Sequence, residues 1–289
     1  MGEKQKVLMV VKTYPTPSTA HGETVCTAGI NIDTGLWVRI FPYPFRTAQQ
    51  YHKFQKYEIF EFDLEKSDLR DKRPESHKLL DIDSARKIAG VISTADAWAE
   101  RMKYLEPTIL PSVQGMTDGL YDETTDTFGR SLALIQVQPN SAQVTFEKDR
   151  REWDAKDSIK LERANGNAQR NLFATNEQIV AFQQLEKLPF KVRLRFRDMA
   201  GGEHALLVQD WEIGVLFLKM RDEHGEEIAL EKVKYKIENQ IFGENKDTYL
   251  ILGSVFAHLK KSALVVVGFV WPNKRPAPPA HGMESLFAS

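Results

Sequence analysis

Four cations alternate with apolar residues in the second half of this 289-residue chain. Single apolar residues separate Lys191, Arg193, Arg195 and Arg197. Because successive side chains of an extended strand point to opposite faces, one face of the predicted strand would carry all four cations. Such a stripe could bind the phosphates of a nucleic acid. The sequence leaves open that Arg193 and Arg195 instead pair with acids such as Glu203 on a neighbouring strand.

Aromatic side chains could complete a nucleic-acid-binding surface, because bases stack on aromatic rings while cations hold the phosphates. Trp37 and Trp211 are the candidate rings, and Arg39 lies two residues after Trp37. The predicted nucleic-acid-binding residues are therefore Trp37, Arg39, Lys191, Arg193, Arg195 and Trp211. Either tryptophan could instead be a core residue.

Cys26 is the one cysteine of the chain and could act as a nucleophile. Its thiolate would attack a carbon electrophile, such as a carbonyl or nitrile, on a base or nucleotide. Asp210 and Glu212 flank Trp211, and on a strand they would share one face and could serve as general acid and base. The alternatives are a small buried cysteine and two carboxylates that balance the neighbouring arginines.

The sequence offers few ligands for a metal or a cofactor. One cysteine allows neither an intrachain disulfide nor a zinc site built from several cysteines. No HExxH motif, P-loop or dinucleotide-binding fingerprint occurs. We therefore predict neither a metal nor a cofactor.

Strands are expected to position most of these residues. In the first third, apolar or alternating runs predict strands, as in a meander or small barrel, at residues 7–12, 25–32, 36–41 and 58–64. A helix is expected at about 94–105. A strand pair at 131–138 and 143–147 would close this first unit.

The second half begins with a charged segment, followed by further strands. Residues 148–172 are highly charged and weakly periodic, and Thr175 opens a capping box for a helix that runs to Leu188. A short helix is expected near 228–235. Strands are predicted at residues 192–196, 205–212, 215–220, 249–256 and 264–270.

These elements predict a mainly β fold with a few helices, of the α+β class, arranged as two small β domains. The first domain, with a helical insertion, would span 1–147, and a linker with its helix would span 148–188. The second domain would span 189–271, and the proline-rich residues 272–289 would form a flexible tail.

Four short segments together resemble a bacterial family that contains two OB-fold domains. They are Cys26-Thr27-Ala28-Gly29-Ile30, Trp37-Val38-Arg39-Ile40-Phe41-Pro42, Arg73-Pro74-Glu75-Ser76 and Gln209-Asp210-Trp211-Glu212. The resemblance implies two OB-like small β-barrels joined by the charged linker and helix. Such proteins look like components of bacterial DNA-modification and anti-phage systems, which implies nucleic-acid recognition. The first hypothesis is therefore an accessory nucleic-acid-binding protein with DNA as its expected partner, although the sequence itself does not distinguish DNA from RNA.

Charge and hydropathy restrict the partners. The chain has 39 Lys and Arg against 40 Asp and Glu, a net charge of -1, so any binding of a polyanion depends on a local patch. The apolar run at residues 7–11 is too short for a signal peptide or a membrane span. A cytoplasmic location without membrane contact is expected.

The tail could carry a docking peptide. Met283, Leu286 and Phe287 resemble the short sliding-clamp-binding peptides of bacterial DNA proteins. After a proline-rich tether, such a peptide could reach a groove on a partner, which makes a protein-docking adaptor a further hypothesis. The same apolar residues could instead fold back onto their own domain.

Overall fold

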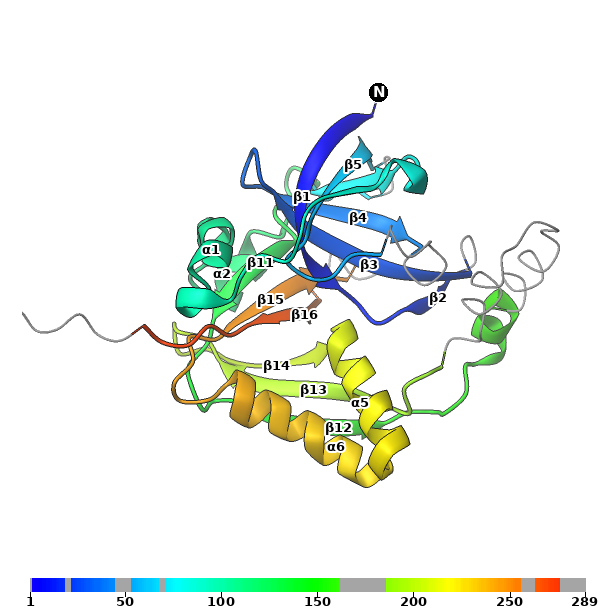
Figure 1. Cartoon of the computed structure of the whole chain (residues 1–289), viewed down its shortest axis with the longest axis vertical. Helices are drawn as coiled ribbons and strands as arrows, with labels where there is room; N and C mark the ends of the chain where they lie inside the picture. The colour runs from blue at the N-terminus through cyan, green and yellow to red at the C-terminus, as the bar shows by residue number, and fades with distance from the viewer. Residues whose placement is uncertain are drawn as a thin grey trace, which may run out of the picture.

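The computed structural model describes residues 2–18, 22–44, 53–67, 71–161, 186–255 and 263–275. This part of the chain forms two seven-stranded sheets and a two-stranded ribbon. In Figure 1 the first sheet lies above the second, and the helices α5 (Trp211–His224) and α6 (Glu226–Tyr235) lie beside the lower strands of the second. The prediction of a mainly β protein with a few helices is confirmed.

The N-terminal sheet closes into a five-stranded barrel, consistent with an OB-like barrel. Its strands are β1 (Glu3–Lys12), β3 (Gly22–Asn31), β4 (Trp37–Tyr43), β5 (Ile59–Lys66) and β6 (Ser76–Leu79). They pair in the order β1-β3-β4-β6-β5, and pairing of β5 with β1 closes the ring. Because alternate side chains point inward, Val7, Met9, Val38, Ile40 and Phe60 fill the interior.

Short elements extend the barrel and lead out of it. β2 (Thr16–Ser18) pairs with β3, and β7 (Arg86–Ala89) pairs with β5 after the 3₁₀ turn η2 (Ile82–Ser84). Helix α1 (Ala95–Leu105) forms where a helix was predicted.

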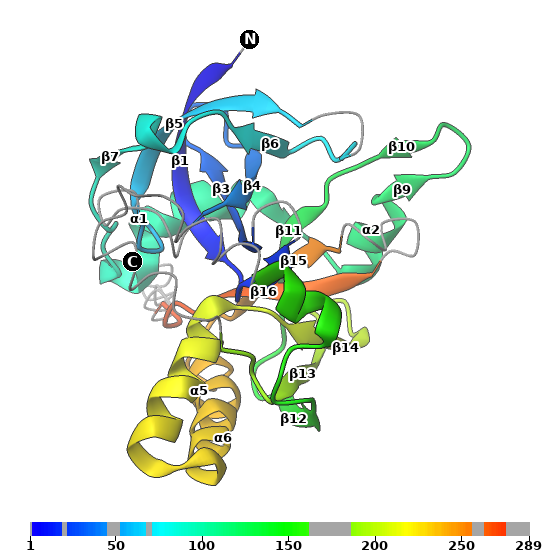
Figure 2. The same ribbon diagram turned by 90° about the vertical axis from the view of Figure 1, so that its right-hand side faces the viewer.

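After α1 the chain passes to the second sheet through a series of short elements. These are the turn η3 (Glu106–Thr108), strand β8 (Ile109–Leu110), helix α2 (Val113–Asp118) and the ribbon of β9 (Tyr121–Asp122) and β10 (Thr127–Phe128). Figure 2 shows the ribbon reaching away from both sheets.

The second sheet has the strand order β12-β13-β14-β16-β15-β11-β8. Its longer strands are β11 (Leu132–Gln136), β12 (Gln143–Lys148), β13 (Phe190–Arg197), β14 (Glu203–Val208), β15 (Tyr249–Ser254) and β16 (Leu264–Val270). Within the described ranges no pairing joins the outer strands β12 and β8. A second barrel is therefore not seen, which corrects the prediction of two barrels.

The two faces of the second sheet are covered differently. Helices α5 and α6 and the following π-helical turn η4 (Lys236–Ile241) pack on one face, against Val192, Leu194 and Phe196 of β13. On the other face, Leu134 of β11 and Val267 of β16 pack against the outside of the barrel. The barrel thus covers the β11–β15–β16 side of that face, and β13 keeps exposed side chains on it.

The structure differs from the sequence prediction at several elements. β11 pairs with β15 and β8, so it belongs to the second sheet although it lies within the predicted first domain. β12 also belongs to that sheet, where it pairs with β13 instead of forming a hairpin with β11. Residues 215–220 lie in helix α5, because Asp210 caps a helix that begins at Trp211.

Two predicted features lie outside the described residues. Residues 162–185 include most of the predicted helix at 175–188, and 276–289 include Met283, Leu286 and Phe287 of the docking peptide. Among the described helices, none has the length and apolar character needed to cross a bilayer.

Candidate nucleic-acid interface

The predicted basic strand is β13, and its cations share one face. Lys191, Arg195 and Arg197 are exposed and Arg193 is half-buried, while the alternate residues are buried. Thr145 of β12 lies opposite Arg193 on the same face. We call these five side chains the β13 ledge.

Acidic neighbours neutralise two of the four cations. Arg193 forms an ion pair with Glu147 of β12, and Arg197 forms one with Glu203 of β14. The hydrogen bond from Arg193 lowers the pKa of Glu147 below its usual value. The alternative that the sequence left open, pairing of Arg193 and Arg195 with acids, is therefore present for Arg193 but, among the described residues, not for Arg195, and Glu203 pairs with Arg197. For Lys191 and Arg195 the described residues provide no ion-pair partner within 4.0 Å.

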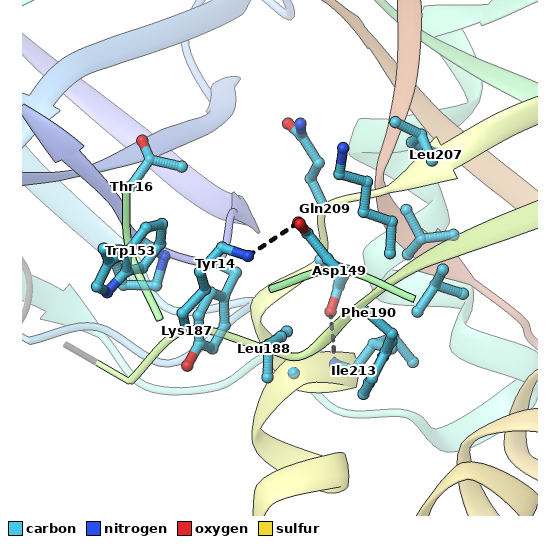
Figure 3. Close-up of a pocket in the computed structure, with 16 residues that line it drawn as sticks. Tyr14, Thr16, Asp149, Trp153, Lys187, Leu188, Phe190, Leu207, Gln209 and Ile213 are labelled. Carbon is cyan, nitrogen blue, oxygen red and sulfur yellow. Dashed lines mark hydrogen bonds and ion pairs between the residues drawn. The ribbon is translucent and has the colours of Figure 1, made fainter. Parts of the chain in front are cut away.

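A pocket of about 210 Å³ lies at the Lys191 end of the ledge, and we call it the Trp153 pocket. Its aromatic walls are Tyr14, Trp153 and Phe190, and the polar groups on its rim include Lys191 and Gln209. Figure 3 shows Tyr14 and Trp153 on one side and Phe190 on the other. An apolar cleft with aromatic walls and a few polar groups is the usual form of a small-molecule or base-binding site.

Contacts between distant segments build this pocket. Tyr14 follows β1, and its backbone N–H donates to the carbonyl of Gln209, the residue after β14, at 2.9 Å. Its ring lies against helix α5 at Gly214, where a Cβ atom would come within 2.4 Å of the ring. On the other side, Lys187 pairs with Asp149 at 3.0 Å, and its ammonium lies 5.9 Å from the Trp153 ring centre.

A second, more polar hollow of about 590 Å³ lies at the opposite end of β13. Arg195, Arg197 and His204 line it together with Asn140. His204 Nε2 lies 2.9 Å from an oxygen of Asp198, which orients the imidazole. The β13 ledge therefore connects two hollows, each with at least one exposed cation.

Asp210 and Glu212 lie at the start of helix α5, which corrects the prediction that they share one face of a strand. Asp210 is the N-cap of α5, where its carboxylate accepts hydrogen bonds from the backbone N–H groups of Glu212 and Ile213. The ammonium of Lys56 lies 2.6 Å from Asp210 and 3.1 Å from Glu212. Both carboxylates therefore form ion pairs with the buried Lys56, and Asp210 also caps the start of α5.

Trp211 lies beside this ion-pair cluster rather than on an exposed surface. Its ring packs against the barrel interior, and the ammonium of Lys12 lies 4.9 Å from its centre. Burial and the repulsion of Lys56 lower the pKa of Lys12 to about 8. Burial alone would lower the pKa of Lys56, but the attraction of Asp210 and Glu212 outweighs it and raises that pKa.

Trp37 and Arg39 are buried where the barrel meets the second sheet. Trp37 is 5% exposed and belongs to the apolar cluster between the two units. Arg39 is 3% exposed and donates a hydrogen bond to the sulfur of Cys26, a half-buried residue, at 3.1 Å. Neither residue faces solvent, so neither contributes to the β13 ledge.

Cys26 lies near the segment that holds Asp210, but its side chain points elsewhere. Thr13 forms a β-bridge with Asp210, and its backbone N–H donates to the carbonyl of Cys26. Asp210 contacts Lys56, whereas the sulfur contacts Arg39. In the described part of the chain, no hydrogen bond links the sulfur to Asp210 or Glu212.

Sequence reasoning missed Tyr14, Trp153 and Lys187. Trp153 and Lys187 lie within residues 148–188, for which a linker and its helix are predicted, and Tyr14 follows the first strand. An isolated tryptophan in a polar segment was the one available signal for such a site. The pocket itself depends on contacts that span more than 130 residues, which no local pattern reveals.

Two family profiles together cover most of the chain. A domain of unknown function, DUF8758, matches residues 3–107, and a second, DUF8757, matches residues 113–288. The division falls close to β8, where the chain passes from the barrel to the second sheet. The search of curated proteins found no match.

Proposed function

The chain belongs to the family described as domain of unknown function DUF8757, and we propose that it binds single-stranded nucleic acid along the β13 ledge. The observation that carries this proposal is the position of Lys191. It lies on the ledge and also lines the Trp153 pocket. One strand could therefore hold phosphates while the adjoining pocket accepts an unstacked base.

The topology of the barrel supports this class of ligand. The order β1-β3-β4-β6-β5 with β4 and β6 parallel is that of an OB-fold Greek key, and OB barrels commonly bind oligonucleotides. The face of β3 and β4 that OB barrels use is largely covered here, because Ala28, Ile30 and Trp37 pack against the second sheet. We therefore propose the β13 ledge of the second sheet, instead of the barrel face, as the binding surface.

The spacing of the unpaired cations fits an extended polyanion. Lys191 and Arg195 are four residues apart on one strand, which corresponds to about 13 Å. Arg193 and Arg197 lie between and beyond them, in ion pairs that are accessible to solvent. Because exposed ion pairs contribute little to stability, phosphates can replace their carboxylates.

The biological setting of this proposal is bacterial DNA modification or anti-phage defence, with DNA as the ligand. It rests on the resemblance of the segments around Cys26, Arg39, Glu75 and Asp210 to the family with two OB-fold domains. The proposed role is that of an accessory protein that holds single-stranded DNA.

Fluorescence anisotropy with a labelled single-stranded DNA, its duplex and the matching RNA tests the proposal. The double variant Lys191→Ala/Arg195→Ala should weaken binding at least about tenfold and reduce the slope of log K against log salt by about 1.4, since each contact to a single-strand phosphate contributes about 0.7. A matched control is Lys232→Ala/Lys234→Ala on α6, which removes the same charge from exposed positions of a helix on the other face of the sheet. Salt-insensitive binding, or equal losses in both variants, would overturn the proposal.

A further inference from the structure

The polar hollow of about 590 Å³ at the end of β13 is lined by residues of three neighbouring strands, and we call it the Arg197 hollow. Gln143 of β12 lies opposite Arg195, and Glu203 of β14 lies opposite Arg197. Directly opposite residues of an antiparallel pair share one face of the sheet, so all four side chains project from the face that carries the β13 ledge. The hollow is therefore a continuation of the ledge.

The turn at residues 138–141 forms one wall of the hollow. The backbone N–H of Gln138 donates to the carbonyl of Arg197 at 2.9 Å, and the hydroxyl of Ser141 accepts from the N–H of Arg197 at 3.2 Å. On its other side, the N–H of Asn140 donates at 3.0 Å to the carbonyl of the residue that follows η4. These hydrogen bonds hold the wall in position without a ligand.

The hollow offers hydrogen-bond donors that the described part of the protein leaves unused. Arg195 has no ion-pair partner in the described ranges, and there the side-chain amides of Asn140 and Gln143 donate no hydrogen bond. Arg197 Nε donates to Glu203 at 2.8 Å, but more than half of each of these two side chains is exposed. Because exposed ion pairs contribute little to stability, an anion can replace the carboxylate.

His204 also lines the hollow but belongs to the other face of the sheet. It lies opposite Phe196, whose side chain packs in the core beneath α5 and α6. The charge on the ledge side of the hollow therefore comes from two guanidinium groups and the carboxylate of Glu203. An anion with more than one negative charge is the ligand that such a hollow would favour.

We propose that the Arg197 hollow binds a phosphomonoester group, carried by the end of a nucleic-acid strand or by a small molecule. A phosphomonoester carries about two negative charges near pH 7 and three oxygens that accept hydrogen bonds, whereas each internal phosphate of a strand carries one charge. Arg195 and Arg197 can each donate two parallel hydrogen bonds to phosphate oxygens. Asn140 and Gln143 supply neutral donors. That the group ends a strand lying on the ledge rests on the proposed function.

Two small probes test the hollow without any nucleic acid. Methyl phosphate is a monoester and dimethyl phosphate is the matching diester, and chemical-shift titration at constant ionic strength gives both dissociation constants. The native protein should bind the monoester at least about tenfold more tightly, because charge-assisted hydrogen bonds are the strong ones. Equal affinity for the two probes would overturn the proposal.

Variants separate contact from net charge. Arg197→Gln/Glu203→Gln removes the guanidinium but keeps the net charge, and it should abolish most of the preference for the monoester. Asn140→Gly removes one amide at a position where φ is 56°, which glycine adopts readily, and should weaken methyl phosphate binding several-fold. The matched control is Arg86→Gln/Glu61→Gln, which makes the same change in an ion pair of the barrel sheet and should leave the preference intact. Equal losses in the hollow and the control variants would contradict the assignment.

Oligonucleotides identify the source of the phosphate. A short single-stranded DNA is compared with and without a phosphate at either end, by anisotropy at fixed salt. A phosphate at one end should strengthen binding at least about fivefold in the native protein, and not in Arg197→Gln/Glu203→Gln. Preference for methyl phosphate without this effect supports the hollow and identifies a small phosphomonoester as the ligand. If DNA binds but the native protein does not prefer methyl phosphate, the hollow is excluded and the proposed function stands. If methyl phosphate is preferred and DNA does not bind, the reverse holds.

Discussion

The ammonium of Lys56 lies 2.6 Å from the carboxylate of Asp210, and both side chains are almost fully buried. Lys56 precedes strand β5 of the barrel, and Asp210 caps helix α5, which packs on the second sheet. The pair therefore fixes the start of the helix to the barrel. It also lies next to the Trp153 pocket, because Asp210 lines that pocket.

Breaking this pair should destabilise the protein strongly. Lys56→Met leaves the buried Asp210 carboxylate without its cation, and we expect a loss of about 3–5 kcal/mol in the free energy of unfolding, measured by urea titration. The control is Lys103→Met, which removes the exposed partner of Glu100 on α1 and should cost less than about 0.5 kcal/mol. Similar losses in the two variants would show that the buried pair has no special role.

The lowered pKa of Lys12 should make stability depend on pH. Its pKa is about 8 in the folded protein, against an ordinary value of 10.5 for a solvated lysine. Between these two values the unfolded chain binds more protons than the folded protein, so stability rises with pH. Lys12→Met removes this contribution. The variant should be more stable than the parent at about pH 7.5, by up to about 3 kcal/mol, and the difference should shrink by about pH 10. A difference that does not change with pH, in urea titrations at both values, would contradict the assigned pKa.

Gly214 should be intolerant of a side chain. In Gly214→Ala the new Cβ would lie 2.4 Å from the Tyr14 ring, so the ring must move and the wall of the Trp153 pocket changes. We expect a loss of about 1–3 kcal/mol in unfolding free energy and weaker nucleic-acid binding. Gly115→Ala on α2 is the control, because its Cβ would meet nothing closer than 3.4 Å. That substitution should be neutral or slightly stabilising.

Removing the acids beside the ledge should strengthen binding of nucleic acid. Glu147→Gln with Glu203→Gln frees Arg193 and Arg197 from their carboxylate partners. Affinity for single-stranded DNA, measured by anisotropy at fixed salt, should rise several-fold, and the salt slope should steepen. The same charge change at the exposed Glu227 and Glu231 of α6 should have a much smaller effect. Equal gains would indicate a net-charge effect instead of a contact.

Trp153 should contribute by stacking. Trp153→Ala should weaken single-strand binding by about 1–3 kcal/mol, while Trp153→Phe retains an aromatic face and should recover much of that loss. Thermal unfolding of each variant checks that the fold is intact. If the Trp153→Ala and Trp153→Phe variants bind single-stranded nucleic acid equally well, bases do not stack on this ring.

The strands in which apolar and polar residues alternate regularly could be predicted from the sequence. The strand β13 follows the predicted pattern residue by residue, because its apolar set packs under α5 and α6 and its cations face outward. Helix α1 was likewise predicted, at about residues 94–105, and it spans Ala95–Leu105. The local pattern of apolar and polar residues was sufficient to predict these elements, because each buries one face and exposes the other.

The start of α5 was predicted wrongly although its signal is present. Asp210 and Glu212 are favourable residues for a helix N-terminus, but the apolar Trp211, Ile213 and Val215 also fit the alternation of a strand. The pairing of β11 with β15 joins segments more than 100 residues apart, and no local signal specifies it. The contact of Cys26 with Arg39 was missed for a related reason, because it depends on the register of β3 against β4.

The apolar seam between the barrel and the second sheet has a consequence for the two matched profiles. Leu8, Val10 and Trp37 on one side and Leu134 and Ile251 on the other are hidden from water only while both parts are present. If the barrel and the second sheet are produced separately, each should expose an apolar surface and should aggregate or bind the other part. The two profiles mark separate stretches of sequence, and the shared apolar cluster leads us to expect that the two parts fold as one unit.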